Sequence, residues 1–437
     1  MNPDRSHDPS RTTWIDGQSQ KQSGFPIQNL PMGVFRESGA SSEGSIGIRI
    51  LDQVVDLKGL AEEGLLDSLG TSIQDACADP ILNGWLALSR SERRDNRLYI
   101  SDLLSTDMGG NKRDTIARHL HPIGDIEMVL PVEVGDYTDF YGSIDHAQRV
   151  GGLFRPDNPL LPNYRWVPIG YHGRASSLVV DGTPIKRPSG QRLVGDTPSF
   201  EPTTRLDYEV EIGAWIGPGN DIGEPIPLEE VEEHFAGISL LNDWSARDMQ
   251  AWEAQPLGPF LGKSFATSVS PWLVTAEALL PFRCPSRTRA SGEPEPLSYL
   301  SSDKNRQNGG IDAIVEVWIQ SLKMREQSIP HYSLSSARLA DLYWTIGQMI
   351  THHSSNGCPL EAGDLMGTGT VSGEKVNAAG CLLELTGGGE NPIQLPSGET
   401  RRFLEDGDEV VLRGYLRGNG EFQRIGLGEC RGTVVTG

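Results

Sequence analysis

The sequence predicts an α+β protein rich in β-strands, with a small N-terminal domain and a larger C-terminal one. The chain has 437 residues, more than a typical single domain holds. It contains 51 Gly and 29 Pro but only 7% aromatic residues, a composition typical of many turns between short strands. The chain also has few long runs of Ala, Leu, Glu and Lys, which favours short strands over long helices.

The N-terminal third predicts a polar tail followed by a small α+β domain. Residues 1–24 are rich in Ser, Gln, Asp and Arg and offer little apolar surface to bury, so we expect a disordered tail. Turn residues near 108–114 and prolines at 122 and 131 predict a domain boundary, which gives a first domain at 25–131. Within it, alternation predicts strands at 46–50 and 54–57, and helices are expected at 81–88 and 98–104.

The second domain, 132–437, is predicted to be mainly strands with one clear helix. Apolar and β-branched runs bounded by Gly, Pro, Asn and Asp predict strands at 178–180, 206–216, 237–241, 311–319, 381–385 and 409–415. Leu339, Leu342, Tyr343, Ile346 and Ile350 recur at three- and four-residue spacing and predict a helix at 336–350.

Charge and cysteine usage exclude several classes of protein. The formal net charge is -21 and no Lys/Arg cluster stands out, which argues against binding nucleic acid or anionic lipid. No stretch approaches the roughly 18 apolar residues that span a bilayer, so we expect no membrane segment and a cytoplasmic (cytosolic) protein. The five cysteines lack any C-x-x-C pair, so we expect them reduced and buried.

Three acidic residues alternate with apolar ones in the segment 206–212. A strand there would direct Asp207, Glu209 and Glu211 to one face. Successive carboxylates on that face lie only about 7 Å apart, and their repulsion is relieved by water or by a shared cation. The segment alone therefore leaves two interpretations open: a solvated acidic face or a cation site.

Two further aspartates and a histidine are candidates for the same site. Asp243 ends an apolar run that should be a buried strand, and Asp139 lies between aromatic residues in what we expect to be a loop. Carboxylates alone favour a hard cation, Ca²⁺, Mg²⁺ or Mn²⁺, over zinc. His146 is a candidate general base near neutral pH, although a single His is more often structural.

Six segments, in order and with few gaps, resemble the fumarylacetoacetase family. They are 25–35 (FPIQNLPMGVF), 135–141 (GDYTDFY), 170–177 (GYHGRASS), 242–248 (NDWSARD), 258–265 (GPFLGKSF) and 351–357 (THHSSNG). The resemblance runs from about residue 25 to the C-terminus. It implies an SH3-like N-terminal domain, a C-terminal mixed β-roll that holds the active site, and a homodimer.

The resemblance also implies a set of site residues and a reaction, the metal-dependent hydrolysis of a carbon–carbon bond in a 1,3-diketo acid, with fumarylacetoacetate as the leading substrate. The implied metal ligands are Asp139, Glu209, Glu211 and Asp243, with Lys263 and Thr267 on the metal-proximal side. The implied catalytic residues are His146, Glu384, Arg247, Gln250 and Lys263. The implied substrate contacts are Tyr141, Arg155, Tyr171, Gln250 and Thr370.

Departures from the family pattern keep other functions open. Ala254 stands where the family carries a substrate-contacting Tyr, and Arg149 and Thr368 also differ. The substrate could therefore be another acylpyruvate or 1,3-diketone. Relatives with the same roll decarboxylate or isomerise β-keto acids, but an implied His146–Glu384 pair favours hydrolysis, since decarboxylation needs no activated water. A scaffold without activity is disfavoured because all the implied ligands and bases are present.

Overall fold

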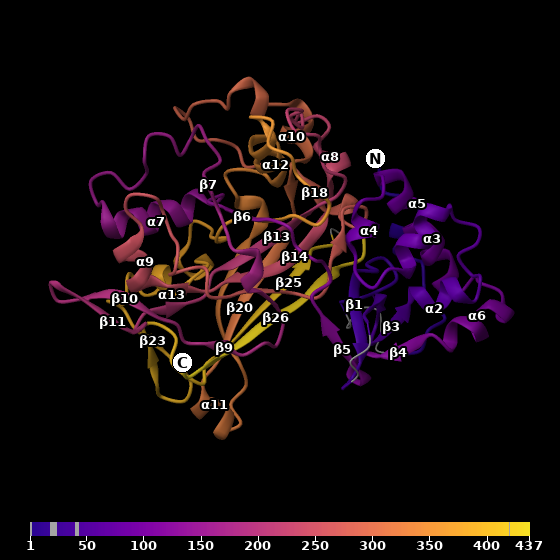
Figure 1. The fold of residues 1–437 in the computed structure, drawn as a ribbon, viewed down its shortest axis with the longest axis horizontal. Helices are drawn as coiled ribbons and strands as arrows, with labels where there is room; N and C mark the ends of the chain where they lie inside the picture. Colours follow the sequence, from indigo (N-terminus) through magenta and orange to yellow (C-terminus); the bar gives the residue numbers. More distant parts are fainter. Residues whose placement is uncertain (1, 18–23, 40–42, 419) are drawn as a thin grey trace.

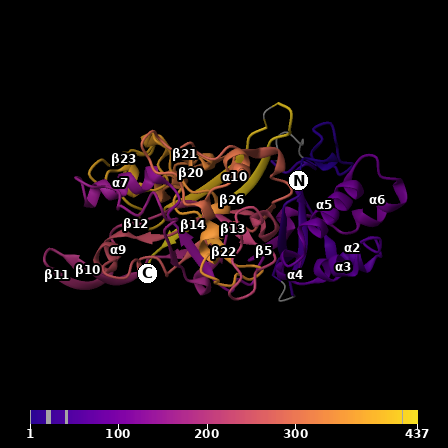
Figure 2. The same ribbon diagram turned by 90° about the horizontal axis from the view of Figure 1, so that it is seen from above.

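The computed structural model describes residues 2–17, 24–39, 43–418 and 420–437. It contains two domains (Figures 1 and 2), with the N-terminal domain packed against one end of a larger, sheet-rich C-terminal domain. One buried apolar cluster joins them: Ile27 and Leu60 of the first domain pack with Trp215 and Leu273 of the second. The predicted class, β-rich α+β with a small N-terminal domain, is confirmed.

The N-terminal domain is a five-stranded antiparallel sheet in the order β4-β3-β2-β1-β5. Ile46, Ile48 and Ile50 alternate along β2 and are all buried, as the sequence pattern predicts. Five helices are inserted between β3 and β4. The bounds are β1 Met32–Glu37, β2 Ser45–Ile50, β3 Gln53–Asp56, α2 Leu57–Glu62, α3 Thr71–Ala78, α4 Asn83–Leu86, α5 Arg90–Leu104, α6 Gly110–Ala117, β4 Leu120–Pro122, η2 Ile123–Asp125 and β5 Ile126–Val129. The SH3-like character stays a prediction.

The expectation of a disordered tail is wrong for residues 2–17. A 3₁₀ turn, η1 (Arg5–His7), is capped by Asp4, and His7 Nε2 lies 2.9 Å from the carbonyl oxygen of Glu277 in the other domain. Arg5 pairs with Asp102 at 2.7 Å. These polar contacts hold the segment together with burial of Ile15 in the apolar cluster of the N-terminal domain. The polar contacts involve residues far along the chain, which is why the composition did not predict them. Residues 18–23 lie outside the described part of the chain.

Two large sheets form the C-terminal domain. The first follows the order β7-β6-β22-β13-β14-β16-β8, with β17 also pairing β14, and it is mixed because β22–β6 and β16–β8 run parallel. Its strands are β6 Tyr137–Phe140, β7 Gly170–His172, β8 Leu178–Val180, β13 Val210–Ile216, β14 Phe235–Asp243, β16 Thr267–Val269, β17 Val274–Thr275 and β22 Leu365–Gly367. The second follows the order β21-β20-β25-β26-β9, with β9 Ile185–Lys186, β20 Ala313–Gln320, β21 Tyr332–Arg338, β25 Glu409–Leu416 and β26 Ile425–Val435.

The two sheets share one apolar core. Ile212 and Leu240 of the first sheet belong to the same buried cluster as Val315 and Leu412 of the second. Every residue of β13 and of β14 is buried, so these strands form the centre of the domain. An acidic side chain on them cannot simply be solvated, because solvent does not reach it.

Helices and short hairpins surround these sheets. The helices are α7 Ile144–Phe154, α8 Val231–His234, α9 Arg247–Glu253, α10 Asp303–Asn308, α11 Leu322–Glu326, α12 Ile346–Ser354 and α13 Leu382–Leu385. The 3₁₀ turns are η3 Ala175–Ser177, η4 Leu280–Phe282, η5 Ser298–Leu300, η6 Leu339–Asp341 and η7 Val376–Ala378. The paired short strands are β10 Ser189–Val194 with β11 Thr197–Pro202, β12 Leu206–Asp207 with β15 Ser245–Ala246, β18 Arg283–Cys284 with β19 Gly310–Ile311, and β23 Ile393–Gln394 with β24 Thr400–Arg401.

Three of the predicted elements differ from the structure. The helix expected at 336–350 begins only at Ile346, because Thr345 and Gln348 form a capping box there. Of the residues before it, 336–338 belong to β21, which pairs with β20, and 339–341 form the 3₁₀ turn η6. The strand expected at 381–385 is instead the single helical turn α13. The strand expected at 206–216 is interrupted between β12 and β13.

The cysteines and the helices add two general findings. All five cysteines are free; Cys77, Cys381 and Cys430 are buried as expected, whereas Cys284 and Cys358 are partly exposed. Among the residues described, no helix combines the length and the apolar character needed to cross a bilayer.

Candidate active site

Four carboxylates converge from neighbouring strands of the first sheet. Asp139 lies in β6, Glu211 in β13 and Asp243 at the end of β14, while Glu209 immediately precedes β13. One oxygen of each lies within 4.8 Å of the others. The expected loop at Asp139 is wrong: β6 pairs in parallel with β22, which brings Asp139 opposite Gly367.

Burial makes this group of carboxylates costly without a cation. The exposed fraction is 5% for Glu209 and 3% or less for the other three. Burial, followed by the charge of Asp243, raises the pKa of Asp139 to about 7. Burial and the neighbouring carboxylates likewise raise the pKa of Glu211 well above its ordinary value. These shifts mean that the site resists ionisation of all four groups at once.

Lys263 and Arg247 offset part of this negative charge. Lys263 Nζ donates to Asp243 Oδ2 at 2.8 Å and also to Glu209. Arg247 Nη1 donates to Glu209 Oε1 at 2.5 Å. Although burial alone would raise it, the pKa of Glu209 is lowered by these two cations. The charge that remains uncompensated is therefore concentrated at Asp139 and Glu211.

The residues present fit a divalent cation of the hard type. Asp139 Oδ1 and Glu211 Oε1 are buried and accept no hydrogen bond from the described residues. A Cβ placed on Gly367 would lie 2.8 Å from both Asp139 Oδ1 and Glu211 Oε2, so only Gly leaves that space free. An all-oxygen donor set with free lone pairs is the chemistry that Ca²⁺, Mg²⁺ and Mn²⁺ prefer.

Two side chains orient Asp243. Thr267 Oγ1 donates to Asp243 Oδ1 at 2.9 Å, and the hydroxyl of Tyr171 donates to Asp243 Oδ2 at 3.1 Å. Thr267 and Lys263, predicted to line the metal-proximal side, both touch this carboxylate. Both therefore lie beside the four-carboxylate cluster and hold Asp243 in place.

His146 and Glu384 form a second buried pair beside the carboxylates. His146 lies in the first turn of α7, where Ser143 caps the helix, and its Nδ1 donates to Glu384 Oε1 at 2.7 Å. With Nδ1 bearing the proton, Nε2 is left as a proton acceptor. Burial would raise the pKa of Glu384, but its interaction with His146 and the hydrogen bond from Arg149 lower it to about 2. Glu384 is therefore an ionised anchor for the imidazole.

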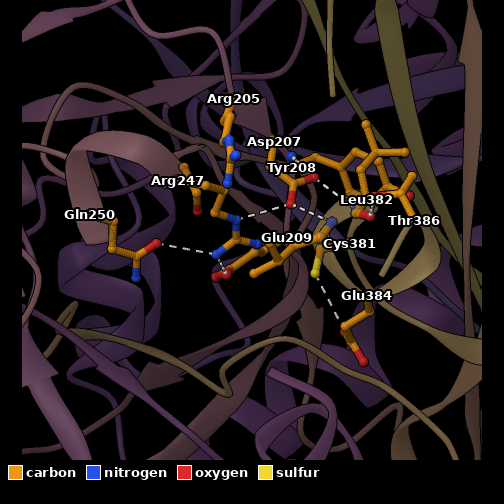
Figure 3. A network of polar contacts seen from close by, with 12 residues as sticks. Arg205, Asp207, Tyr208, Glu209, Arg247, Gln250, Cys381, Leu382, Glu384 and Thr386 are labelled. Atoms are coloured by element: carbon orange, nitrogen blue, oxygen red, sulfur yellow. Dashed lines mark hydrogen bonds and ion pairs between the residues drawn. The ribbon is translucent and has the colours of Figure 1, made fainter. Parts of the chain in front are cut away.

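A cavity of about 590 Å³ brings these groups together. His146, Asp139, Glu209, Arg247 and Lys263 all line it. In Figure 3 Arg247 lies between Asp207, Glu209 and Gln250, with Gln250 Oε1 accepting from Arg247 Nη1 at 3.3 Å. Arg247 Nη2 is buried and donates to none of the described residues. The cavity is thus lined by an imidazole, two members of the carboxylate cluster and two cationic side chains.

The residues predicted to contact substrate also lie around this cavity. Tyr141, Arg155, Tyr171, Gln250 and Thr370 line it. The Tyr141 ring packs edge-on against His146, with centroids 5.2 Å apart. Thr370 Oγ1 is buried and unpaired within the described chain, whereas Arg155 is exposed at the end of α7.

Sequence reasoning missed several residues that shape the site. Asp207 does not join the acidic cluster, because β12 ends there and its carboxylate accepts from Arg247 and α13 instead. Arg149 donates to Glu384 Oε2 at 2.8 Å, and Ser372 donates to Oε1 at 2.7 Å. Gly367, whose missing side chain leaves space between Asp139 and Glu211, was not predicted either. None of these positions has a local pattern that would have revealed its partner.

Comparison with known proteins identifies the family. The model of the fumarylacetoacetate (FAA) hydrolase C-terminal domain matches residues 137–435, and that of the fumarylacetoacetase N-terminal domain matches residues 28–131. The chain belongs to the fumarylacetoacetase family. The two matches meet near residue 131, where the sequence predicted a boundary.

Members of the fumarylacetoacetase family match almost the whole chain. Fumarylacetoacetase of Oryza sativa is 45% identical over 94% of this chain and 94% of its own length. The Homo sapiens fumarylacetoacetase is 43% identical over 95% of this chain and 97% of its own. The solved fumarylacetoacetate hydrolase from Exiguobacterium antarcticum shares the fold, with a TM-score of 0.51, 17% identity, and coverage of 93% of this chain and all of that one.

Proposed function

We propose that this chain hydrolyses fumarylacetoacetate to fumarate and acetoacetate with a divalent cation. The observation that carries the proposal is that His146, held by Glu384, lines one cavity together with Arg247 and with Asp139 and Glu209, two members of the four-carboxylate cluster. Relatives named fumarylacetoacetase, 41–45% identical over nearly their full length, support this choice of substrate. The site residues and the similarity to these relatives both support cleavage of the carbon–carbon bond between the two ketone groups of a 1,3-diketo acid.

Asp139, Glu209, Glu211 and Asp243 would hold the cation, which supplies Lewis-acid polarisation of the diketone oxygens. His146 Nε2 accepts a proton from water, whose oxygen attacks the carbonyl carbon on the fumaryl side. Glu384 fixes the imidazole and stabilises its charged form. The carbon–carbon bond then breaks, its electron pair passes into the enolate of acetoacetate, and the proton on His146 returns to that carbon.

Arg247, Lys263 and Gln250 would stabilise the charge that develops on oxygen. Arg247 Nη2 is a buried donor with no hydrogen-bond acceptor among the described residues, and Lys263 is fixed by two carboxylates. Gln250 accepts from Arg247 Nη1 and so orients the guanidinium. Donors that are already positioned and dry stabilise an oxyanion more than water can.

Substrate orientation falls to residues at the cavity wall and mouth. Arg155 is exposed at the end of α7, where its guanidinium can pair with a terminal carboxylate of the diketo acid. Tyr141, Tyr171 and Thr370 line the same cavity. Thr370 Oγ1 has no hydrogen-bond partner among the described residues, so we propose it as a contact for a polar group of the substrate.

A second candidate is a different acylpyruvate or 1,3-diketone. Apolar side chains, Phe154, Ala251 and Leu257, line the same cavity as Ala254. A small side chain at 254 leaves room for a bulkier or less polar acyl group. Decarboxylation or isomerisation of a β-keto acid is disfavoured by the His146–Glu384 pair, which serves to activate water.

Three finer points remain predictions. The cation is expected to be Ca²⁺ or Mg²⁺, with Mn²⁺ as a third choice, from the all-carboxylate donor set. A homodimer follows from the family resemblance. The cytosolic location follows from the sequence, and the partner expected is a small diketo acid rather than nucleic acid or membrane.

The test is the loss of ultraviolet absorbance of fumarylacetoacetate, with fumarate and acetoacetate quantified. The purified chain is assayed as isolated, after chelation, and after adding back Ca²⁺ or Mg²⁺. Loss of the diketone with stoichiometric fumarate, abolished by chelation and restored by cation, supports the proposal. An intact diketone in the presence of bound cation would refute this substrate, and a set of 1,3-diketones with larger acyl groups would then test the second candidate.

A further inference from the structure

A buried aspartate outside the acidic cluster joins the two halves of the site. Asp207 is 0% exposed, and its carboxylate accepts four hydrogen bonds. Oδ1 accepts from the backbone N–H groups of Tyr208 at 2.9 Å and Leu382 at 2.8 Å. Oδ2 accepts from the backbone N–H of Leu383 at 2.9 Å and from Arg247 Nε at 3.0 Å. Figure 3 shows Asp207 between Arg247 and the start of α13.

One side of Asp207 fixes the helical turn that carries Glu384. The first N–H groups of a helix need acceptors, and the N-cap residue of α13, Cys381, makes no side-chain capping hydrogen bond. Asp207 supplies both acceptors from a distant part of the chain. Glu384 is the third residue of this single turn, so the position of its carboxylate depends on the Asp207 contacts.

The other side of Asp207 fixes the guanidinium at the acidic cluster. Arg247 donates through Nε to Asp207 and through Nη1 to Glu209. These two bonds set the plane of the guanidinium and therefore the direction in which the unpaired Nη2 points. Replacing the Asp207 carboxylate would leave Arg247 held through Nη1 alone.

We propose that Asp207 is a positioning residue that sets the spacing between the His146–Glu384 pair and the Arg247 guanidinium. The inference rests on the proposed function, because it assigns Asp207 a role in that reaction. Asp207 is not among the residues that line the cavity, so it acts through its partners: α13, Arg247 and the backbone of Tyr208. Water attack and oxyanion stabilisation must occur on one substrate at once, and the spacing between their donors limits the rate.

The test is Asp207→Asn, which keeps the size but turns one acceptor into a donor facing the Leu383 N–H or Arg247. We expect kcat to fall about 10- to 100-fold, with KM and Ca²⁺ affinity much less affected. The matched control is Asp408→Asn. Asp408 is also 0% exposed and pairs with an arginine, Arg401, at 2.8 Å, but it does not line the cavity. The control is expected to keep the wild-type kcat.

A double-mutant cycle separates positioning from a general loss of stability. If Asp207 acts through its partners, Asp207→Asn costs much less in Glu384→Gln and Arg247→Lys backgrounds than in the wild type. Equal losses in every background, or a kcat matching that of Asp408→Asn, would overturn the proposal. If Asp207→Asn does not fold, Asp207→Glu is tested instead, because it keeps the charge but displaces the carboxylate. A wild-type kcat in Asp207→Glu would also overturn the proposal. Inactive wild-type protein with cation bound would instead be a failure of the proposed function.

Discussion

Removal of the divalent cation should make stability fall as pH rises through the neutral range. Burial and the charge of Asp243 raise the pKa of Asp139 from 3.8 to about 7, and the pKa values of Glu211 and Asp243 are raised as well. Between the unfolded and the folded pKa, such a carboxyl is protonated in the folded chain and ionised in the unfolded one. The folded chain then binds more protons, so its stability decreases with increasing pH.

The magnitude follows from the shift at Asp139. One pKa unit corresponds to about 1.4 kcal/mol, so the rise from 3.8 to about 7 amounts to roughly 4 kcal/mol. This contribution is complete below the unfolded pKa of 3.8 and is lost as pH rises to about 7. Glu209 and Glu384 have lowered pKa values, so their contribution to stability rises with pH up to about their unfolded value of 4.5 and adds little slope above about pH 5.

The assay is the thermal unfolding midpoint of chelator-treated protein from about pH 5 to about pH 8. The midpoint should fall with pH, and added Ca²⁺ should raise it most at the high end, where the carboxylates are free to bind it. Asp139→Asn is the matched control, because it removes the titrating group while keeping its shape. The reasoning is refuted if the wild type and Asp139→Asn show the same pH slope, or if Ca²⁺ leaves the midpoint unchanged at high pH.

Three substitutions extend the account. His146→Ala should lower kcat by about 10²- to 10⁴-fold with Ca²⁺ binding retained by calorimetry, because it removes the proposed base; a wild-type kcat would contradict that role. Glu211→Ala should abolish both Ca²⁺ binding and turnover, and tight Ca²⁺ binding by this variant would argue against the carboxylate site. Arg149→Met should lower the thermal midpoint and kcat with Ca²⁺ affinity unchanged, because a hydrogen bond to the ionised Glu384 contributes about 1.5–3 kcal/mol; unchanged midpoint and kcat would contradict it.

The sequence predicts elements well where periodicity and burial agree. The alternation of Ala313, Val315, Val317 and Ile319 places one face of β20 in the core, and the apolar run ending at Asp243 is the central strand β14. Glu209 and Glu211 were recognisable as neighbours that repel each other, which is a local property. Their convergence with Asp139 is a property of strand order, which the family resemblance implied and local pattern did not.

The errors arise where distant hydrogen bonds decide local structure. The apolar segment at 381–385 has the composition of a strand, but Asp207, more than 170 residues earlier, supplies acceptors for its N–H groups and it forms a helical turn. The polar N-terminal segment is ordered by His7 and Arg5 through contacts with residues far along the chain. Such partners cannot be found from spacing, because they lie next to each other only after folding.

The central claim is that a cation-dependent water, activated by His146, cleaves the diketone. The most direct measurement is turnover of fumarylacetoacetate in ¹⁸O-labelled water, with mass spectrometry of both products. The account predicts one ¹⁸O atom in the new carboxylate of fumarate and no ¹⁸O introduced into acetoacetate by the cleavage step. It also predicts that no product forms after chelation. Release of carbon dioxide without labelled fumarate, or label incorporation unaffected by chelation, would contradict it.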